Sequence, residues 1–450
     1  MYWNQTKECM DRGELKKLQS ERLVKMVSYV YHNVPYYREK MQKAGVEPGD
    51  IRGLEDIEKL PFTTYEDLNK AYPFGLAAVP KSELVRVHAS SGTTGKPKIA
   101  VYTRRDIDTW SECAARCLTM AGVTRDDVIQ VGYGYGLFTG GLGAHYGAEY
   151  VGALVLPMST GNTKKLIDMM IDCGATAIAC TPSYLLHVAE DLQKAGLVDK
   201  IKLKTAICGA EPWTNEMRAS IEKQLGIKAY DIYGLTEILG PGVAADCDAH
   251  AGLHIWEDHF LPEILDPATL KAVPEGQSGE LVITTLTKEG MPMIRYRTKD
   301  LTSLETSKCS CGRTMARIQR FKGRTDDMLI IRGVNVFPSQ VEAALLTIDG
   351  TTPHYMIIVD RVDNADTFEV QVEVDERFFS DEVSKLENLS KQINAKLREA
   401  LGLNAKVSLV QPNPIPHRRL FQRHRRLSPR QDGRSLSRFR IFRHPERAAN

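Results

Sequence analysis

The sequence contains few cysteines, and it lacks a long uninterrupted apolar run. Nine cysteines in 450 residues are too sparse for a disulfide-stabilised scaffold. The glycine-rich run from Gly132 to Ala148 carries no formal charge, but it is shorter than the ~20 apolar residues that a membrane-spanning helix needs. No leader with a charged start, an apolar centre and a small-residue end opens the chain. We therefore expect reduced thiols, no membrane span and a cytoplasmic location.

An excess of one charge sign is also absent, because 59 Lys and Arg stand against 57 Asp and Glu. The distribution is nevertheless uneven: residues 417–450 contain eleven Arg, no Lys and two acids. The rest of the chain is mildly acidic, so any nucleic-acid binding would depend on this tail alone. A chain of 450 residues exceeds what a single hydrophobic core usually organises, so two or more domains are expected.

Short β-branched runs alternate with helical patterns from about Lys81 to Tyr233, after an amphipathic segment at Glu14–His32. This alternation is typical of an α/β sheet covered by helices. A strand-rich stretch follows from Gly252 to Arg320. The predicted strands are 84–87, 99–102, 153–157, 175–180, 205–208 and 280–286, and the predicted helices are 164–173 and 216–225.

After Gly323 the pattern changes to that of a small α+β unit. Its predicted strands are 328–331, 355–359, 368–374 and 406–409, and its predicted helices are 339–346 and 381–401. About 90 residues suffice for an independent domain. We predict a large N-terminal domain of helix-covered sheets over residues 1–323, a small α+β C-terminal domain over residues 324–416, and an aberrant Arg-rich tail over residues 417–450.

The run from Ala89 to Lys98 is the most informative in the chain. Its glycines free the backbone to turn, its hydroxyls and N–H groups can donate to an anion, and its lysines supply charge. The spacing is not that of a Walker loop, because two residues separate the glycines and Pro97 follows Lys96. A solvated turn is the alternative. We interpret the run as a phosphate-binding loop built from Ser90, Ser91, Gly92, Thr93, Thr94 and Gly95.

Four further blocks follow in order: Gly209–Trp213, Asp231–Glu237, Arg295–Leu301 and Gly323–Pro338. Together with the loop, they resemble the motifs of the adenylate-forming superfamily of acyl-CoA synthetases, and within it those of the phenylacetate-CoA ligases. The resemblance extends from about Tyr2 to about Pro416. It implies that a carboxylate reacts with ATP to give an acyl-adenylate and pyrophosphate, after which the coenzyme A thiol displaces AMP.

The chemistry explains why these residue types are needed. A carboxylate can attack the α-phosphate only after the charge of both anions is neutralised. Glu237 is suited to bind Mg²⁺, and Thr94 and Lys98 act with it on the phosphates; the alternative for Glu237 is a surface carboxylate. By resemblance, the other nucleotide contacts are Asp300 on the ribose, Arg320 and Arg324 on phosphate or ribose oxygens, and Ala210, Glu211, Pro212, Asp231, Ile232, Tyr233, Gly234 and Thr236 around the adenine and phosphates.

The segment Gly132–Gly141 is similar to the substrate segment of the family. Aromatic residues spaced by glycines can line a flat apolar slot. The resemblance places Tyr133, Phe138, Ala210, Ile232 and Pro241 around an aryl group, and packing of this loop on its own core is the alternative. Asp326 is similar to the hinge about which the small domain rotates; the alternative is a turn-forming Asp.

Three cysteines and one histidine form a possible metal site. Cys309 and Cys311 make a tight pair, and Cys247 and His254 lie upstream. Three thiolates and an imidazole complete a tetrahedral set for structural Zn²⁺, although the Cys-x-Cys spacing is tighter than in common zinc knuckles. Reduced thiols without metal are the alternative, and His250 and His259 are the fallback ligands. The other cysteines are interpreted as core or surface thiols: Cys9, Cys113, Cys117, Cys173, Cys180 and Cys208.

The chain departs from the family near its end. The family's small domain ends in a glycine-containing loop whose lysine contacts the carboxylate and the α-phosphate, but no lysine follows Lys406 in this sequence. A shifted reading frame after about Pro416 explains the abrupt change to arginine, and a basic disordered tail is the alternative. Loss of one such contact typically costs ~10²–10³ in rate, so we expect impaired adenylation with thioester formation retained.

These observations predict an AMP-forming phenylacetate-CoA ligase that uses ATP, Mg²⁺ and coenzyme A. One rival is an adenylate-forming enzyme for another acid or acceptor, and a second is a non-catalytic nucleotide-binding protein. A nucleic-acid-binding protein would need the tail. The expected partners are small molecules, without nucleic acid or membrane, and a homodimer is compatible with the sequence.

Overall fold

The computed structural model describes residues 1–90, 97–321, 323–324, 329–331, 334–348, 350–362, 365–374, 383–410 and 439–443. The chain divides into two compact units. The first unit comprises residues 1–181, 194–211 and 225–321, and the second comprises residues 182–193, 212–224 and 322–450. None of the helices formed by the described residues is both long and apolar enough to cross a membrane.

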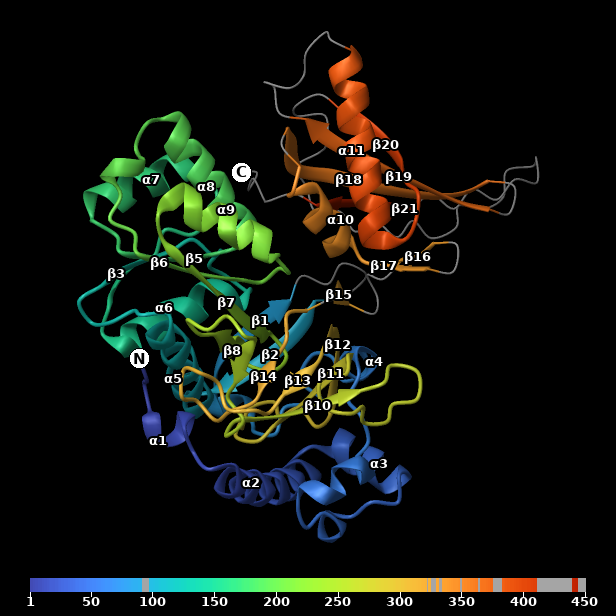
Figure 1. The fold of residues 1–450 in the computed structure, drawn as a ribbon. Helices are drawn as coiled ribbons and strands as arrows, with labels where there is room; N and C mark the ends of the chain where they lie inside the picture. Colours follow the sequence, from blue (N-terminus) through green and yellow to red (C-terminus); the bar gives the residue numbers. More distant parts are fainter. Residues whose placement is uncertain are drawn as a thin grey trace. The chain divides into compact units, whose positions relative to one another are not determined.

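A nine-stranded sheet lies at the centre of the first unit (Figure 1). In order across the sheet, its strands are β13 (Leu304–Glu305), β14 (Arg317–Ile318), β9 (Leu253–Ile255), β8 (Gly240–Asp246), β7 (Lys228–Leu235), β6 (Thr205–Gly209), β5 (Ala177–Cys180), β3 (Val128–Val131) and β4 (Leu154–Leu156). The strands from β4 to β7 pair in parallel, whereas β8 pairs antiparallel with β7. Strand β7 is therefore the strand at which the pairing changes from parallel to antiparallel.

Two smaller antiparallel sheets complete the first unit. Strands β1 (Leu84–Ser90) and β2 (Lys98–Thr103) form a hairpin in which Ser90 pairs with Lys98. Strands β10 (Phe260–Leu265), β11 (Gly279–Thr285) and β12 (Tyr296–Thr302) form the other sheet. One apolar core connects these sheets with the nine-stranded sheet and the N-terminal helices.

Helices α5 (Arg104–Met120) and α6 (Thr139–Val151) pack closely against each other. Helix α5 begins at Thr103, whose hydroxyl accepts a hydrogen bond from the backbone N–H of Asp106 in a capping box. Glycine is needed on α6, because a Cβ at Gly147 would lie 2.5 Å from the Cβ of Ala114 on α5. Helix α7 (Thr163–Asp172) begins at the cap Asn162.

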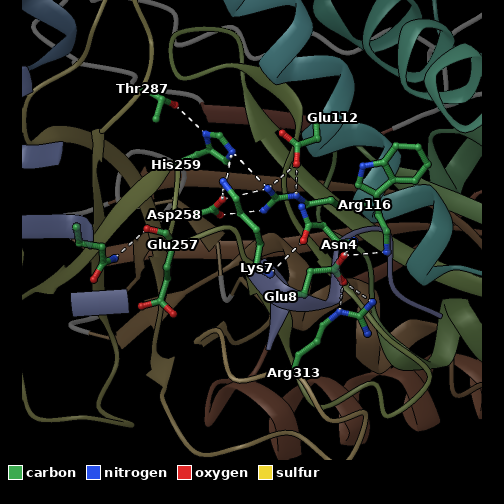
Figure 2. Close-up of polar contacts among 12 residues, drawn as sticks. Asn4, Lys7, Glu8, Glu112, Arg116, Glu257, Asp258, His259, Thr287 and Arg313 are labelled. Carbon is green, nitrogen blue, oxygen red and sulfur yellow. Dashed lines mark hydrogen bonds and ion pairs between the residues drawn. The ribbon is translucent and has the colours of Figure 1, made fainter. Parts of the chain in front are cut away.

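The N-terminal segment is attached to the first unit by buried charges (Figure 2). Glu8, with no exposed surface, forms an ion pair of 2.7 Å with the buried Arg313, and Arg12 pairs with Glu257. Because both partners of the first pair are removed from water, loss of either one would leave an uncompensated buried charge. The helical elements here are α1 (Gln5–Glu8), α2 (Arg12–Asn33), α3 (Pro35–Lys43) and α4 (Tyr65–Lys70), with 3₁₀ turns at Pro48–Asp50, Leu54–Lys59, Lys81–Glu83 and Val198–Lys200.

In the second unit, a sheet of order β20-β19-β18-β21 carries helix α11 across one face (Figure 1). The hairpin of β18 (Thr351–Val362) and β19 (Ala365–Val374) forms its centre. Ile357, Val370 and Leu397 are fully buried in this unit's own core. The other elements are α8 (Pro182–Lys194), α9 (Asn215–Leu225), β15 (Gly323–Arg324), β16 (Leu329–Ile331), β17 (Val334–Val336), α10 (Pro338–Leu345), α11 (Val383–Leu401), β20 (Lys406–Val410) and β21 (Phe439–Arg443).

The predicted fold class is confirmed: a large α/β part with a strand-rich region is combined with a small α+β part. The predicted strands and helices occur with ends shifted by a few residues, and β18 and β19 are longer than predicted. Helices α5, α6 and α8 were not predicted, and neither was β21, which lies inside the Arg-rich tail and pairs with β18.

Candidate active site

The segment that carries Glu237 is a short turn between β7 and β8. Its backbone is held by side chains from elsewhere in the first unit. The Tyr102 hydroxyl donates to the carbonyl oxygens of Thr236, at 2.9 Å, and Leu239, at 3.3 Å. The Lys288 ammonium donates to the carbonyl oxygen of Glu237 at 2.9 Å. The Glu237 side chain is largely buried, so the turn presents a carboxylate from a fixed backbone.

Lys288 is a functional candidate that the sequence did not reveal. It follows β11 and is 3% exposed, with its Nζ 4.7 Å from the centre of the Tyr102 ring. Burial lowers the pKa of Lys288 to about 8, and the nearby carboxylates of Asp106 and Glu237 oppose that shift. No motif marks this lysine in the sequence, because its partners lie more than 50 residues away along the chain.

Tyr233 and Asp300 meet between β7 and β12. The Tyr233 hydroxyl donates a hydrogen bond of 2.6 Å to Oδ2 of Asp300, and its ring lies 4.4 Å from that of Phe321, centre to centre. The Asp300 backbone N–H donates to the hydroxyl of Thr298. Two residues predicted to contact the nucleotide are thus brought together from positions 67 residues apart. Arg320, adjacent to Phe321, is half-buried.

Close backbone packing shapes the turn after β6. A Cβ at Gly209 would lie 2.1 Å from the carbonyl oxygen of Ile232 on β7, so only glycine fits there. The next residue, Ala210, has a φ of +71° and is exposed. Asp231 begins the predicted adenine-binding run on β7, and its N–H donates to Asp246 on β8. The predicted residues Ala210 and Glu211 therefore follow a strand that lies directly beside the run Asp231–Gly234.

The predicted phosphate-binding loop connects β1 and β2. Its ends are described: Ser90 pairs with Lys98 in the hairpin, and the buried Lys98 ammonium lies 3.1 Å from the centre of the Tyr65 ring. Residues 91–96, including the predicted Ser91, Gly92, Thr93, Thr94 and Gly95, lie outside the described residues. The predicted hinge residue Asp326 also lies outside them, and Pro212 and Arg324 belong to the second unit.

A small apolar cavity lies beside β7. Its volume, measured as the space open to the centre of a water molecule, is about 10 Å³, or room for about one water. Three predicted substrate-pocket residues line it, Tyr133, Ile232 and Pro241, whereas Phe138 and Ala210 do not; the Phe138 side chain is 42% exposed. The remaining lining residues are Ala114, Leu118, Gly143, Ala144, Ala179 and Ile207.

Neighbouring residues of β7 thus have different environments. Ile232 lines the apolar cavity, while the next residue, Tyr233, bonds Asp300. Successive side chains of a strand point to opposite faces of the sheet. One strand therefore serves a candidate acyl pocket on one face and a candidate nucleotide site on the other.

The predicted metal ligands do form a cluster. The ligand atoms of Cys247, His254, Cys309 and Cys311 all lie within 4.8 Å of one another, with the Cys247 and Cys309 sulfurs 3.7 Å apart. Tetrahedral thiolates at ~2.3 Å from zinc are ~3.8 Å apart, so this arrangement fits Zn²⁺. A hydrogen bond from Cys247, with a further contribution from His254, holds the pKa of Cys311 well below the usual thiol value.

The elements that bring these ligands together are the ends of short strands. His254 lies on β9 and Cys247 directly follows β8, while Cys309 and Cys311 occupy the loop between β13 and β14. The fallback ligands are not part of the cluster. His250 contacts Asp246, and His259 contacts Thr287 and Asp258.

Comparison with known proteins identifies the class of enzyme. The family model of the AMP-binding enzymes matches residues 14–287, and the model of the AMP-binding enzyme C-terminal domain matches residues 333–427. The chain belongs to the AMP-binding enzyme family. The second match extends past Pro416 into the Arg-rich tail.

Full-length relatives identify the particular group. A phenylacetate-coenzyme A ligase of Thermus thermophilus is 49% identical over 423 residues, which cover 91% of this chain and 95% of that protein. A phenylacetate-coenzyme A ligase of Escherichia coli K12 is 47% identical over 412 residues, covering 91% and 94%. Within the AMP-binding enzymes, the chain is therefore a member of the phenylacetate-coenzyme A ligase family, as the motifs predicted.

A solved structure supports the same fold. A crystal structure of 2-hydroxyisobutyryl-CoA ligase in the postadenylation state, in complex with R3-HIB-AMP, superimposes with a TM-score of 0.87. The two sequences are 31% identical, and the match covers 92% of this chain and 90% of that chain.

Proposed function

We propose that this protein ligates phenylacetate to coenzyme A in two steps at the carboxyl end of β7. In the first step, a carboxylate oxygen attacks the α-phosphorus of ATP, and pyrophosphate leaves with the electrons of the broken P–O bond. In the second, the coenzyme A thiolate attacks the acyl carbon, and AMP leaves; the thiol proton passes to solvent. The observation that carries this proposal is the convergence of Ile232, Tyr233 and Glu237 on β7 and the turn that follows it.

The residues present fit the groups that the reaction needs. The buried Glu237 carboxylate on a fixed turn suits Mg²⁺, a hard ion that prefers oxygen ligands, and Mg²⁺ supplies charge neutralisation when it is bound. Asp300, oriented by Tyr233, accepts hydrogen bonds from the ribose hydroxyls. Ser90 and Lys98 anchor the two ends of the loop proposed to hold the phosphates.

The acyl pocket would be the cavity bounded by Tyr133, Ile232 and Pro241. Its apolar walls suit a phenyl ring better than a charged or strongly polar acid. A ring is larger than one water molecule, so side chains at the wall must move when the acid binds. Specificity for phenylacetate over other aryl acids would arise from how far these walls can open.

Adenylation and thioester formation would differ in efficiency in this chain. No lysine follows Lys406, so the lysine that acts during adenylation in the family has no counterpart in residues 407–450. We place the mobile domain at residues 324–416 with Asp326 as its hinge. Thioester formation uses another face of that domain and is retained.

The Cys₃His cluster would hold one structural Zn²⁺. Its four donors are the ligands zinc prefers, and the cluster joins β9 and the segment after β8 to the loop that follows β13. The ion would cross-link these segments and would take part in no step of the reaction. The proposed location of the protein is the cytoplasm, where thiols stay reduced.

Separate assays of the two half-reactions test the proposal. The purified full chain is given Mg·ATP, phenylacetate and coenzyme A, and phenylacetyl-CoA and AMP are detected by mass spectrometry. Synthetic phenylacetyl-adenylate with coenzyme A tests the second step alone. We expect slow overall turnover but efficient conversion of the adenylate, whereas ATP binding with no turnover in either assay would favour a non-catalytic nucleotide-binding protein.

A panel of acids tests the specificity. Pyrophosphate release is compared for phenylacetate, indoleacetate, ring-substituted phenylacetates and short-chain acids. The panel is repeated with a variant in which a glycine-rich, lysine-bearing loop replaces the residues after Pro416. A preference for a short-chain acid would contradict the proposed acyl pocket, and an unchanged rate in the loop variant would contradict the proposed effect of the tail.

A further inference from the structure

Lys288 has a buried ammonium group that contacts the backbone of Glu237, the residue proposed to bind Mg²⁺. The side chain is 3% exposed, and its Nζ donates a hydrogen bond of 2.9 Å to the Glu237 carbonyl oxygen. Removing an ammonium from water is costly unless the site compensates for it. Here the compensation comes from that carbonyl, from the Tyr102 ring 4.7 Å away, and from the carboxylates of Asp106 and Glu237.

The backbone around Lys288 is fixed independently of Glu237. Both carboxylate oxygens of Asp106 accept backbone N–H groups, from Glu289 at 2.7 Å and from Gly290 at 2.8 Å. The Tyr29 hydroxyl donates to the carbonyl oxygen of Glu289 at 3.1 Å. Because the start of α5 and a residue of α2 hold this loop, the position of the Lys288 side chain is set by the protein itself.

In the turn between β7 and β8, side chains donate hydrogen bonds to three of the backbone carbonyl groups. The Tyr102 hydroxyl donates to the carbonyl oxygens of Thr236 and Leu239, and the Lys288 ammonium donates to the carbonyl oxygen of Glu237. Lys288 thus contacts the backbone of Glu237, the residue whose carboxylate is proposed to bind Mg²⁺. Loss of the contact would allow Glu237 to shift, and a misplacement of ~1 Å at a catalytic group can cost ~10²-fold in rate.

We propose that Lys288 is a positioning residue that fixes the Glu237 carboxylate for Mg·ATP. The proposal rests on the proposed role of Glu237. Lys288 does not touch the substrates; it acts by donating to the Glu237 carbonyl and by placing a positive charge against that residue. Its effect therefore falls on the use of Mg²⁺ during adenylation and not on thioester formation.

The test compares substitutions of Lys288 in the full-length protein. K288M removes charge and donors at similar volume, K288Q retains one N–H donor without charge, and K288R retains charge and donors. Y29F is the matched control, because it removes one hydrogen bond to the same loop, does not contact Glu237 and leaves both Asp106 contacts that hold the loop. For each variant, thermal unfolding is measured first, and then pyrophosphate release is followed as Mg²⁺ is raised at saturating ATP and phenylacetate.

We expect K288M to raise the Mg²⁺ concentration for half-maximal rate ~10-fold or more, K288Q to have a smaller effect, and K288R to restore much of the wild-type value. Y29F should lower the melting temperature without moving the Mg²⁺ dependence. Conversion of supplied phenylacetyl-adenylate should change less than two-fold in every variant.

A folded K288M or K288Q protein with the wild-type Mg²⁺ dependence would overturn the proposal, and so would an equal loss in the thioester-forming assay. If K288M does not fold, K288Q decides the outcome. If the wild-type protein shows no Mg²⁺-dependent pyrophosphate release, the proposed function fails instead, and the two failures are thereby distinguished.

Discussion

The hydroxyl of Tyr233 lies 2.6 Å from a carboxylate oxygen of Asp300 and donates a hydrogen bond to it. The contact joins β7 of the nine-stranded sheet to β12 of the smaller antiparallel sheet. The hydrogen bond orients the Asp300 carboxylate, which is proposed to accept hydrogen bonds from the ribose hydroxyls. The pair therefore links two sheets of the first unit at the proposed nucleotide site.

Removing the Tyr233 hydroxyl should weaken ATP binding without abolishing catalysis. We expect Y233F to raise the KM for ATP ~5–10-fold with a small change in kcat, because one hydrogen bond contributes ~1 kcal/mol. Steady-state kinetics at saturating phenylacetate measure this. Y230F is the matched control, since Tyr230 on the same strand bonds Asp248 instead and should leave the KM for ATP unchanged.

Neutralising Glu237 should separate the two half-reactions. E237Q keeps the size of the side chain but loses the charge, so adenylation should fall by ~10²–10³ while conversion of supplied adenylate falls far less. Half-reaction rates measure the difference. The surface substitution E399Q, which removes only an exposed pair with Lys396, should change neither rate, and an equal fall of both half-reactions in E237Q would contradict the assigned role.

Shortening Ile232 should enlarge the acyl cavity. I232A removes three carbon atoms from the wall, so ring-substituted phenylacetates should gain activity relative to phenylacetate, and stability should fall by ~2–4 kcal/mol. I178A on β5 is also fully buried but does not line the cavity. The control should lose similar stability and keep the wild-type preference; a matching shift in I178A would show that loosening alone alters specificity.

Removing the metal should destabilise the first unit. Elemental analysis should find one zinc per chain, and C309S or a strong chelator should lower the melting temperature, because structural zinc contributes to folding free energy. C173S, at a thiol outside the cluster, should retain zinc and stability. Full stability in metal-free protein with reduced thiols would contradict a structural zinc site.

His259 should make the protein less stable as the pH falls from about 6.5 to 4. Burial lowers the pKa of His259 to about 4, while Asp258 partly opposes the shift and Arg116 adds to it, as the contacts in Figure 2 show. Unfolded chains bind this proton near pH 6.5 and the folded protein only near 4, so up to ~3 kcal/mol of stability is lost across this window.

Urea unfolding at a series of pH values measures this loss. H259Q should show a shallower fall of unfolding free energy between pH 6.5 and 4.5 than the wild type. H32Q, at an exposed histidine, should follow the wild type. Parallel curves for H259Q and the wild type would contradict the assignment.

The sequence revealed those parts of the site that depend on short motifs. The block Asp231–Glu237, which covers the end of β7 and the turn after it, was recognised by its resemblance to the family. The cluster of Cys247, His254, Cys309 and Cys311 was predicted from ligand type together with that resemblance. Lys288 was missed because its contacts with Tyr102 and Glu237 form only after β2, β8 and β11 are assembled. Phe138 was assigned to the pocket by the family resemblance; the structure places it directly before the helix start at Thr139, with its side chain partly exposed.

The helices missed by periodicity have a physical explanation as well. Helix α6 contains glycines that lower helix propensity, and these glycines are needed because α5 and β8 approach its backbone closely. The glycines that close packing requires therefore weaken the helical pattern in the sequence of α6. The capping box of α5 at Thr103 and Asp106 was the available signal.

The alternation of Ile232 and Tyr233 along β7 has a consequence for how this scaffold can diversify. If Ile232 meets the acid and Tyr233 orients the nucleotide contact, as proposed, a substitution at Ile232 can alter the choice of acid while the contact between Tyr233 and Asp300 is kept. An insertion of a single residue in this strand would instead exchange the faces of these two positions and damage both at once. On this proposal, a change of acid would follow more readily from a point substitution than from a change in strand length.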